Sequence, residues 1–227
     1  MAPCREGTGV WDLTLGDSPT TTCRGDAIIA AMGTFLVLVT GYAGAGKTTL
    51  APRLADGLDA AWISRDAIHE RIYSGWEPRH PALFSEGYDP VVGGSTFLEG
   101  KVTWDIFLWT LQQVVPHTPV VADTPFNHAW NRDMFAAAAA RIEVPMVEVV
   151  LTGDPDALLA RVLARALSAA THELKAKFSV QPRHYYEGDY EPVLDPDRVV
   201  PVDTTELAMV DIPKVAELVR GKLPGVR

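Results

Sequence analysis

Largely apolar runs alternate with amphipathic stretches along most of the chain. The apolar runs are typical of strands buried on both faces of a parallel sheet, and they lie at 35–39, 61–63, 119–123, 146–151 and 199–202. Apolar residues spaced three and four apart indicate helices at 46–58, 66–73, 96–114, 130–141, 154–169 and 210–219. The alternation predicts an α/β fold: a doubly wound parallel sheet of five strands with helices on both faces, joined by right-handed crossovers.

Two segments fall outside this alternation. Residues 1–31 are rich in Gly, Thr, Asp, Pro and Ser without periodicity, which predicts a disordered N-terminal arm before a single domain at 32–227. The alternative is a start placed too early, with Met32 as the true first residue. Residues 74–95 carry repeated Gly and Pro and are much longer than the roughly 2–6 residues of an ordinary connection, so we expect a functional insert there.

The composition is that of a globular domain. Of the 227 residues, 47% are hydrophobic and 22% are charged. Asp and Glu outnumber Lys and Arg by 29 to 20, and the net charge of −9 argues against nucleic acid as a partner, because an acidic surface repels a polyanion. The only cysteines, Cys4 and Cys23, lie in the predicted arm, which argues against disulfides or a zinc site and favours a reducing, cytoplasmic location.

The longest apolar run is too short for a membrane span. It covers roughly 27–39, is interrupted by Gly33 and Thr34, and falls short of the ~20 residues that a span needs. A signal peptide is the alternative, but no basic segment closely precedes the run, and its second half leads into a glycine-rich loop. We therefore predict no membrane segment.

The strongest motif is Gly-Tyr-Ala-Gly-Ala-Gly-Lys-Thr at 41–48, between a predicted strand and a predicted helix. Glycines let backbone N–H groups turn inward around phosphate oxygens, and the helix N-terminus adds a favourable dipole. Lys47 supplies a charge for the β and γ phosphates, and the Thr48 hydroxyl suits Mg²⁺. An ordinary glycine turn is the alternative, but four specified positions in the correct context favour a phosphate-binding P-loop. The expected nucleotide-binding residues are Gly41, Tyr42, Ala43, Gly44, Ala45, Gly46, Lys47, Thr48 and Thr49.

Other P-loop classes require features that this sequence lacks. It contains neither the Asn-Lys-x-Asp nor the Asp-x-x-Gly pattern of a GTPase, nor the Leu-Ser-Gly-Gly signature of an ABC-type ATPase, and it is short for a helicase. The remaining class is the small kinases, which transfer phosphate to an acceptor bound beneath a lid.

Four segments, in this order, resemble the small P-loop kinases: Gly-Tyr-Ala-Gly-Ala-Gly-Lys-Thr-Thr-Leu at 41–50, Trp-Ile-Ser-Arg-Asp-Ala-Ile at 62–68, Val-Val-Ala-Asp-Thr at 120–124 and Leu-Leu-Ala-Arg-Val-Leu-Ala-Arg at 158–165. That group includes AAA_33 domains, shikimate and gluconate kinases, chloramphenicol phosphotransferase and the kinase domains of polynucleotide kinases. The similarity covers about residues 34–222. It implies ATP and Mg²⁺ as cofactors, a sheet order of 2-3-1-4-5, and a lid at 166–191.

Asp66 and Asp123 each follow or end a predicted strand, at the sheet edge where open α/β folds bind ligands. In the kinases that this chain resembles, the aspartate matching Asp66 takes the proton of the acceptor hydroxyl; a plain helix N-cap is the alternative. Asp123 occupies a position where a carboxylate holds Mg²⁺ directly or through water, and a turn-forming residue is the alternative.

Arg161 and Arg165 lie four residues apart and so share one helix face. The resemblance implies that they flank the lid, one against adenine and one reaching the transferred phosphate, and that they join Lys47 and Asp66 in the catalytic set. A solvated helix face is the alternative. Arg132 and His128 are weaker candidates, for the substrate side of the site.

Two aromatic residues of the insert, Trp76 and Tyr88, are expected to contact the acceptor. Aromatic rings mixed with polar groups suit a small amphipathic ligand, and the insert carries more acid than base, which disfavours a phosphate-rich one. A surface loop with local packing, or an oligomer contact, is the alternative.

Together these features predict an ATP-dependent phosphotransferase that phosphorylates a hydroxyl of a small molecule, such as an antibiotic, a nucleoside or a sugar-like metabolite. Two alternatives stay open: a kinase of nucleic-acid ends or nucleotide sugars with the same fold, and an ATP-hydrolysing regulatory module without an acceptor. The oligomeric state is left open.

Overall fold

The computed structural model describes residues 33–76, 88–89, 94–95, 98–126, 129–168 and 181–223. The predicted arm, His128, most of the insert at 74–95 and the central part of the predicted lid lie outside the described residues. Strands and helices alternate along the described part, as the hydrophobic pattern predicts.

Five parallel strands form the central sheet: β1 (Leu36–Gly41), β2 (Ala61–Ser64), β5 (Val120–Asp123), β6 (Met146–Thr152) and β7 (Val199–Asp203). Their order across the sheet is β2-β5-β1-β6-β7. Counted along the chain this is 2-3-1-4-5, so the predicted fold class and strand order are confirmed. The first strand is central, with Leu36 paired to Val120 on one side and to Met146 on the other.

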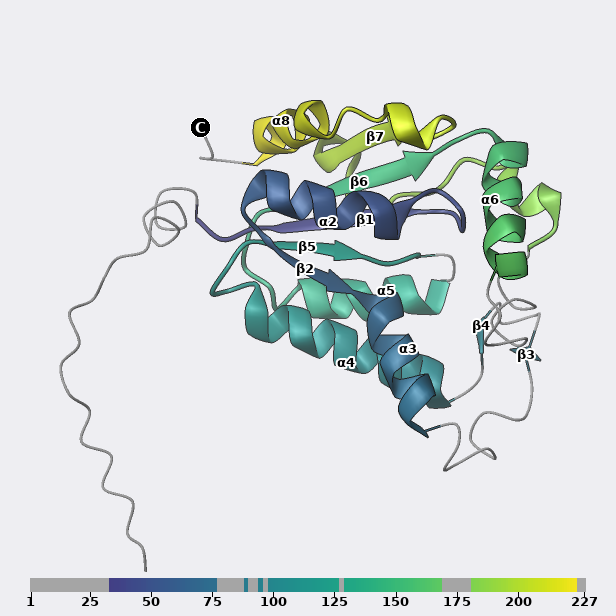
Figure 1. Cartoon of the computed structure of the whole chain (residues 1–227). Helices are drawn as coiled ribbons and strands as arrows, with labels where there is room; N and C mark the ends of the chain where they lie inside the picture. The colour runs from purple at the N-terminus through teal and green to yellow at the C-terminus, as the bar shows by residue number, and fades with distance from the viewer. Residues whose placement is uncertain are drawn as a thin grey trace, which may run out of the picture.

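Helices cover both faces of the sheet (Figure 1). Within the described residues these helices are α2 (Lys47–Leu58), α3 (Arg65–Trp76), α4 (Leu98–Val114), α5 (Ala129–Ala139), α6 (Pro155–Ser168) and α8 (Ile212–Lys222). One face of the sheet packs against α2 and α8, and the other packs against α4 and α5. Helix α3 lies beside α4, and α6 lies at the carboxyl edge of the sheet, where the strands end. No helix of the described residues is long and apolar enough to cross a membrane.

Short elements complete the described chain. Two-residue strands β3 (Tyr88–Asp89) and β4 (Gly94–Ser95) pair antiparallel. Three 3-10 turns follow later in the chain: η2 (Arg183–Tyr186), η3 (Pro196–Arg198) and η4 (Leu207–Met209).

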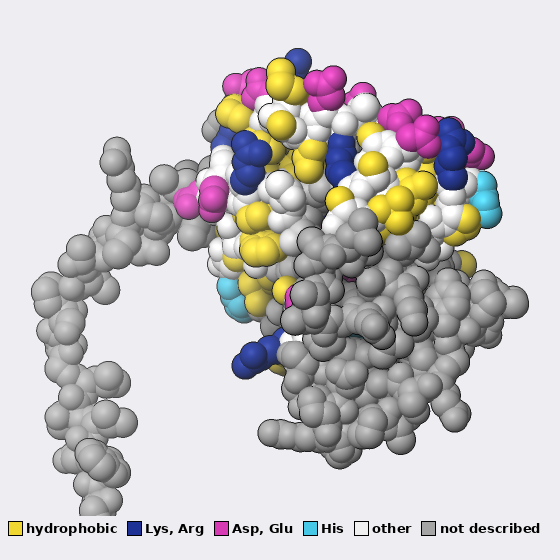
Figure 2. Space-filling view, turned by 45° about the vertical axis from the view of Figure 1, so that its right-hand side comes forward, with side chains coloured by type: hydrophobic (Ala, Val, Ile, Leu, Met, Phe, Trp, Pro, Cys, Tyr) yellow, Lys and Arg dark blue, Asp and Glu magenta, His cyan; other side chains and the backbone are white. Residues whose placement is uncertain are grey.

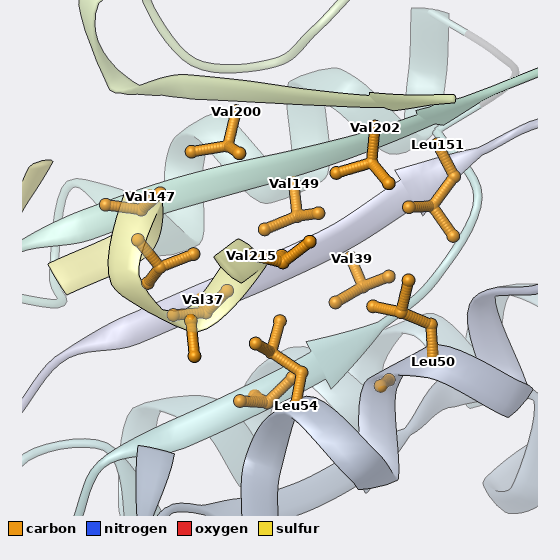
Figure 3. Close-up of a cluster of buried hydrophobic side chains, with 14 of the residues drawn as sticks. Val37, Val39, Leu50, Leu54, Val147, Val149, Leu151, Val200, Val202 and Val215 are labelled. Carbon is orange, nitrogen blue, oxygen red and sulfur yellow. The ribbon is translucent and has the colours of Figure 1, made fainter. Parts of the chain in front are cut away.

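Side chains of β1 alternate between the two faces. Val37 and Val39 face α2 and α8, whereas Leu36 and Leu38 face α4 and α5, and all four are fully buried. A strand covered on both faces needs apolar residues at every position, which explains the uninterrupted run. Figure 3 shows the first of these clusters, in which valines and leucines from β1, β6, β7, α2 and α8 come together.

The start of α3 differs from the sequence prediction. This helix begins at Arg65 and continues to Trp76, so it enters the segment predicted to be an irregular insert. The backbone N–H of Ala67 donates to Ser64 Oγ at 3.3 Å, which makes Ser64 the capping residue. The alternative reading of Asp66 as the helix N-cap is therefore wrong, because Asp66 lies inside the first turn.

A buried carboxylate interrupts the apolar pattern of β6. Glu148 is fully buried, and its Oε1 accepts from Thr40 Oγ1 at 2.7 Å. Its Oε2 accepts from the backbone N–H groups of Val193 and Leu194 at 2.7 and 2.9 Å. Burial raises the pKa of Glu148 against the opposing effect of these hydrogen bonds. The carboxylate thereby holds the segment before η3 against the end of β1.

Candidate active site

The P-loop packs directly on two neighbouring elements, and its glycines make this possible. Gly41 has a φ of 133°, and a Cβ there would lie 2.3 Å from the carbonyl oxygen of Leu151. Gly44 has a φ of 79°, and a Cβ there would lie 2.3 Å from the carbonyl oxygen of Leu158. Both contacts involve backbone atoms that cannot move aside, so only glycine fits at either position.

The N-terminus of α2 is built to receive an anion. Gly46 is its N-cap in the left-handed region, and among the residues that the structure describes no side chain caps the helix. Its first turn carries no acidic residue. The first N–H groups and the positive end of the helix dipole thus remain available to phosphate oxygens.

The Lys47 side chain folds back over the P-loop. Its Nζ donates to the carbonyl oxygens of Gly41 at 2.9 Å and Tyr42 at 2.8 Å, and its side chain is buried. Burial lowers the pKa of Lys47 to about 8, although the nearby carboxylates of Asp66 and Asp123 oppose the shift. A phosphate group would therefore meet a desolvated, preorganised ammonium group at neutral pH.

A pocket of about 320 Å³ opens beside this lysine. Several residues singled out from the sequence line it together: Lys47, Thr48, Thr49, Asp66, Arg161 and Arg165. They come from α2, α3 and α6, which meet at the carboxyl edge of the sheet. The fold therefore gathers them at the ligand-binding edge that open α/β sheets use.

Asp66 presents its carboxylate to this pocket from the first turn of α3. Arg65 Nη1 lies 3.0 Å from Asp66 Oδ1, and the Asp66 side chain is 49% exposed. Burial raises the pKa of Asp66, but the positive charges of Arg65 and Lys47 outweigh it, and the net shift is downward. The group is therefore an anion at neutral pH, facing the Lys47 ammonium group.

Asp123 ends β5 and is almost fully buried, at 2% exposed. Its Oδ2 accepts from Thr48 Oγ1 at 3.2 Å and its Oδ1 from Trp62 Nε1 at 3.0 Å. Burial raises the pKa of Asp123 and outweighs the hydrogen bonds from Ser64, Trp62 and Thr48, and the negative charge of Asp66 raises it further. The predicted neighbours Thr48 and Asp123 are thus brought together, whereas Trp62 carries no sequence signal of its own.

The adjacent oxygens of Thr48 and Asp123 fit Mg²⁺, which prefers hard oxygen ligands. Within the described ranges there is no cluster of three or more His, Cys, Asp or Glu side chains that could hold a metal ion. Magnesium sites commonly use only one or two protein oxygens together with substrate phosphates.

Arg161 connects the two walls of the pocket. Its Nη1 donates to the carbonyl oxygen of Gly44 at 3.1 Å, and its Nη2 donates to those of Thr204 and Thr205 at 2.5 and 2.6 Å. The guanidinium thus ties the P-loop to the turn after β7, and the alternative of a solvated helix face does not describe it. Arg165 is exposed at the pocket.

Comparison with known proteins supports this assignment of the loop. The family model AAA_33, described as an AAA domain, matches residues 36–181, which is more than half of the chain. The chain belongs to the AAA_33 family. A search of curated proteins finds no match.

Solved structures share the fold of this AAA_33 domain. A candidate kinase from Chloroflexus aurantiacus j-10-fl has 20% identity and a TM-score of 0.64, over 86% of this chain and 99% of that one. The tunicamycin resistance protein of Deinococcus radiodurans has 14% identity and a TM-score of 0.51, over 84% and 95%. A shikimate kinase from Acinetobacter baumannii has 17% identity and a TM-score of 0.48, over 86% and 94%. At these identities the first two likenesses show the fold alone.

Tyr42 has a different environment from the other P-loop residues of this AAA_33 domain. Its ring lies edge-on to Tyr185, Tyr186 and Tyr190, with centroids 5.1, 5.9 and 5.3 Å away, and its hydroxyl donates to the carbonyl oxygen of Gly188 at 3.0 Å. The side chain packs under the segment that follows residue 181 and does not line the described pocket. This part of the predicted lid at 166–191 therefore rests on the P-loop.

The remaining predicted substrate residues stay predictions. Arg132 donates to the carbonyl oxygens of Phe126 at 3.2 Å and Pro192 at 3.0 Å, and also to that of Glu191. It holds the segment before η3 and does not line the described pocket. Trp76 and Tyr88 belong to α3 and β3, and His128 lies outside the described residues.

The surface of the described part is mixed in charge. On the face in Figure 2, Lys and Arg side chains occur singly, between acidic and apolar ones, and the described side chains of that face form no continuous basic patch.

Proposed function

We propose that this protein is an ATP-dependent phosphotransferase that phosphorylates a hydroxyl of a small molecule. The observation that carries the proposal is the position of Asp66, which lines the same pocket as Lys47 and Thr48. Binding or hydrolysing a nucleotide requires the P-loop and a magnesium site. A further carboxylate, anionic and facing the phosphate-binding lysine, is what an incoming hydroxyl needs as its proton acceptor.

The residues divide the reaction between them. The acceptor oxygen bonds to the γ-phosphorus, the bond from that phosphorus to the β–γ bridging oxygen breaks, and the hydroxyl proton passes to Asp66. Lys47 and the N–H groups at the start of α2 hold the phosphate oxygens and stabilise the charge that moves toward ADP. Mg²⁺, held by Thr48 and Asp123, would neutralise further phosphate charge. Arg165, exposed at the pocket, is positioned to add a positive charge.

The acceptor class rests on charge and on the neighbouring folds. An acidic protein with scattered basic side chains favours a small acceptor over a nucleic-acid end. The likeness to a tunicamycin resistance protein supports including hydroxylated antibiotics among the candidates, beside nucleosides and sugar-like metabolites.

The test is an acceptor screen. Purified protein with MgATP is incubated with a panel of hydroxylated antibiotics, nucleosides and sugars, and ADP formation and product mass are measured for each. We expect ADP formation to be strongly stimulated by one class, with a product heavier by one phosphoryl group, and Lys47→Ala to abolish both. ADP formation that no small molecule changes would contradict the proposal and favour the regulatory ATPase. Phosphorylation of nucleic-acid ends alone would favour the other alternative.

A further inference from the structure

Trp62 is a half-exposed aromatic residue at the edge of the sheet. It is 42% exposed, and it lies on β2, the outermost strand next to β5. In the register of these strands Trp62 pairs with Val121 and Ser64 with Asp123. Residues two apart on a strand share a face, so Trp62 and Asp123 both project toward α2, against which Val121 packs. Such a diagonal pair is close enough for a long side chain to reach across.

The hydrogen bond between them matters more to Asp123 than to Trp62. The indole N–H donates to Asp123 Oδ1 at 3.0 Å, and in its half-exposed position water would satisfy this donor equally well. Asp123 is only 2% exposed, so its carboxylate depends on protein donors. The contact therefore constrains the carboxylate.

Three side chains hydrogen-bond to the Asp123 carboxylate: those of Thr48, Trp62 and Ser64, which pairs with Asp123 across β2 and β5. Thr48 Oγ1 donates to Oδ2 at 3.2 Å, while Trp62 occupies Oδ1. A carboxylate held at one oxygen can turn about its bond to Cβ, and the Trp62 donor on Oδ1 adds to Thr48 and Ser64 in setting its plane. The indole is a neutral donor, so it orients Asp123 without cancelling the negative charge that a cation would need.

We propose that Trp62 is a positioning residue of the magnesium–nucleotide site: its indole N–H holds the Asp123 carboxylate so that Oδ2 stays beside the Thr48 hydroxyl. The inference rests on the proposed function, since it assigns Mg²⁺ to Thr48 and Asp123. Loss of a hydrogen-bonding partner of a metal ligand weakens metal binding by about 10–100-fold in known sites. The same direction is expected here.

Three variants test the role of the N–H group. Trp62→Phe keeps an aromatic ring but removes the donor. Trp62→His restores an N–H at the corresponding ring position, because imidazole Nε2 and indole Nε1 stand the same number of bonds from Cα. Trp109→Phe is the matched control, since Trp109 is 60% exposed on α4, on the opposite face of the sheet. For each protein, calorimetry gives the affinity for ADP in EDTA and its rise with added Mg²⁺.

The expected pattern separates positioning from structural support. In Trp62→Phe the Mg²⁺ concentration that gives half of the affinity gain should rise about tenfold. Its ADP affinity in EDTA and its melting temperature should stay near wild type. Trp62→His should recover part of the loss, and Trp109→Phe should match wild type.

Three other outcomes would overturn the inference. These are an unchanged Mg²⁺ requirement in Trp62→Phe, an equal loss of ADP affinity in EDTA, or a Trp62→His variant that folds but recovers nothing. Should Trp62→Phe fail to fold, Trp62→Leu, which also lacks the donor, takes its place in the comparison with Trp62→His and has the same expected rise in the Mg²⁺ requirement. A wild-type protein whose ADP affinity ignores Mg²⁺ would instead contradict the proposed function.

Discussion

Raising the pH from 7 to 9 should weaken nucleotide binding through a single group, Lys47. Burial lowers its pKa to about 8, so the charged fraction falls from about nine-tenths at pH 7 to about one-tenth at pH 9. A lysine with an ordinary pKa near 10.4 would stay almost fully charged over this range. Phosphate oxygens favour the ammonium form, so nucleotide binding requires the proton and becomes weaker as the pH rises through about 8.

The magnitude follows from that fraction. If only the charged form binds tightly, the dissociation constant of ADP should rise about tenfold between pH 7 and pH 9. The measurement is a calorimetric titration with ADP in EDTA at half-unit steps of pH and constant ionic strength. Starting at pH 7 keeps the terminal phosphate mainly ionised throughout, since its second pKa is about 6.

Lys47→Ala is the matched control. It should bind ADP more weakly at pH 7, and its affinity should change little up to pH 9 because the titrating group is gone. Wild-type affinity that stays constant between pH 7 and pH 9 would refute the reasoning from burial. An equal loss in wild type and Lys47→Ala would assign the pH dependence to another group.

The remaining predictions concern the acceptor side and the loop. Asp66→Asn should lower the rate of acceptor phosphorylation by about 10²–10⁴-fold while ADP affinity and melting temperature stay near wild type. Parallel losses of activity and stability would argue against a proton-accepting role. Gly41→Ala should lower the melting temperature by several degrees, because its Cβ would lie 2.3 Å from a carbonyl oxygen of β6. Gly221→Ala is the control, because its Cβ would meet nothing within 4 Å and its melting temperature should stay near wild type. Calorimetry that found the two variants equally stable would contradict the packing argument. Trp76→Ala and Tyr88→Ala should each raise the KM for the acceptor several-fold and leave the KM for ATP nearly unchanged in steady-state kinetics. A change in the KM for ATP alone would contradict an acceptor role.

The fold could be predicted because its main signals are local. A strand buried on both faces needs apolar residues at each position, and β1 shows this directly. The P-loop likewise depends on glycines within a few residues of each other, and Gly41 and Gly44 have the positive φ values that this chemistry requires. The order of strands came from the resemblance to small P-loop kinases and is confirmed by the pairing of β1 with β5 and β6.

What the sequence did not predict depends on contacts between distant segments. Tyr42 is predicted to bind nucleotide from its place in the motif, and the sequence did not reveal that its ring packs on tyrosines more than 140 positions later. Arg132 donates a hydrogen bond to the backbone carbonyl of Pro192, and no spacing of residues along the chain indicates this contact. Trp62 reaches Asp123 only because β2 and β5 pair in one particular register.

The buried carboxylate of Glu148 has a consequence for the evolution of this domain. It accepts hydrogen bonds from Thr40, 108 positions earlier, and from two backbone N–H groups 45 and 46 positions later. An apolar residue in its place would leave three donors without an acceptor, and each donor that stays buried would cost about 1–3 kcal/mol of folding stability. Losing Glu148 and the Thr40 hydroxyl together leaves one fewer unpaired donor and is therefore less costly. Among AAA_33 relatives, positions 40 and 148 should therefore vary as a correlated pair. Where position 148 is apolar, proline should become acceptable at 193 or 194, because the N–H group that it removes would no longer have an acceptor there.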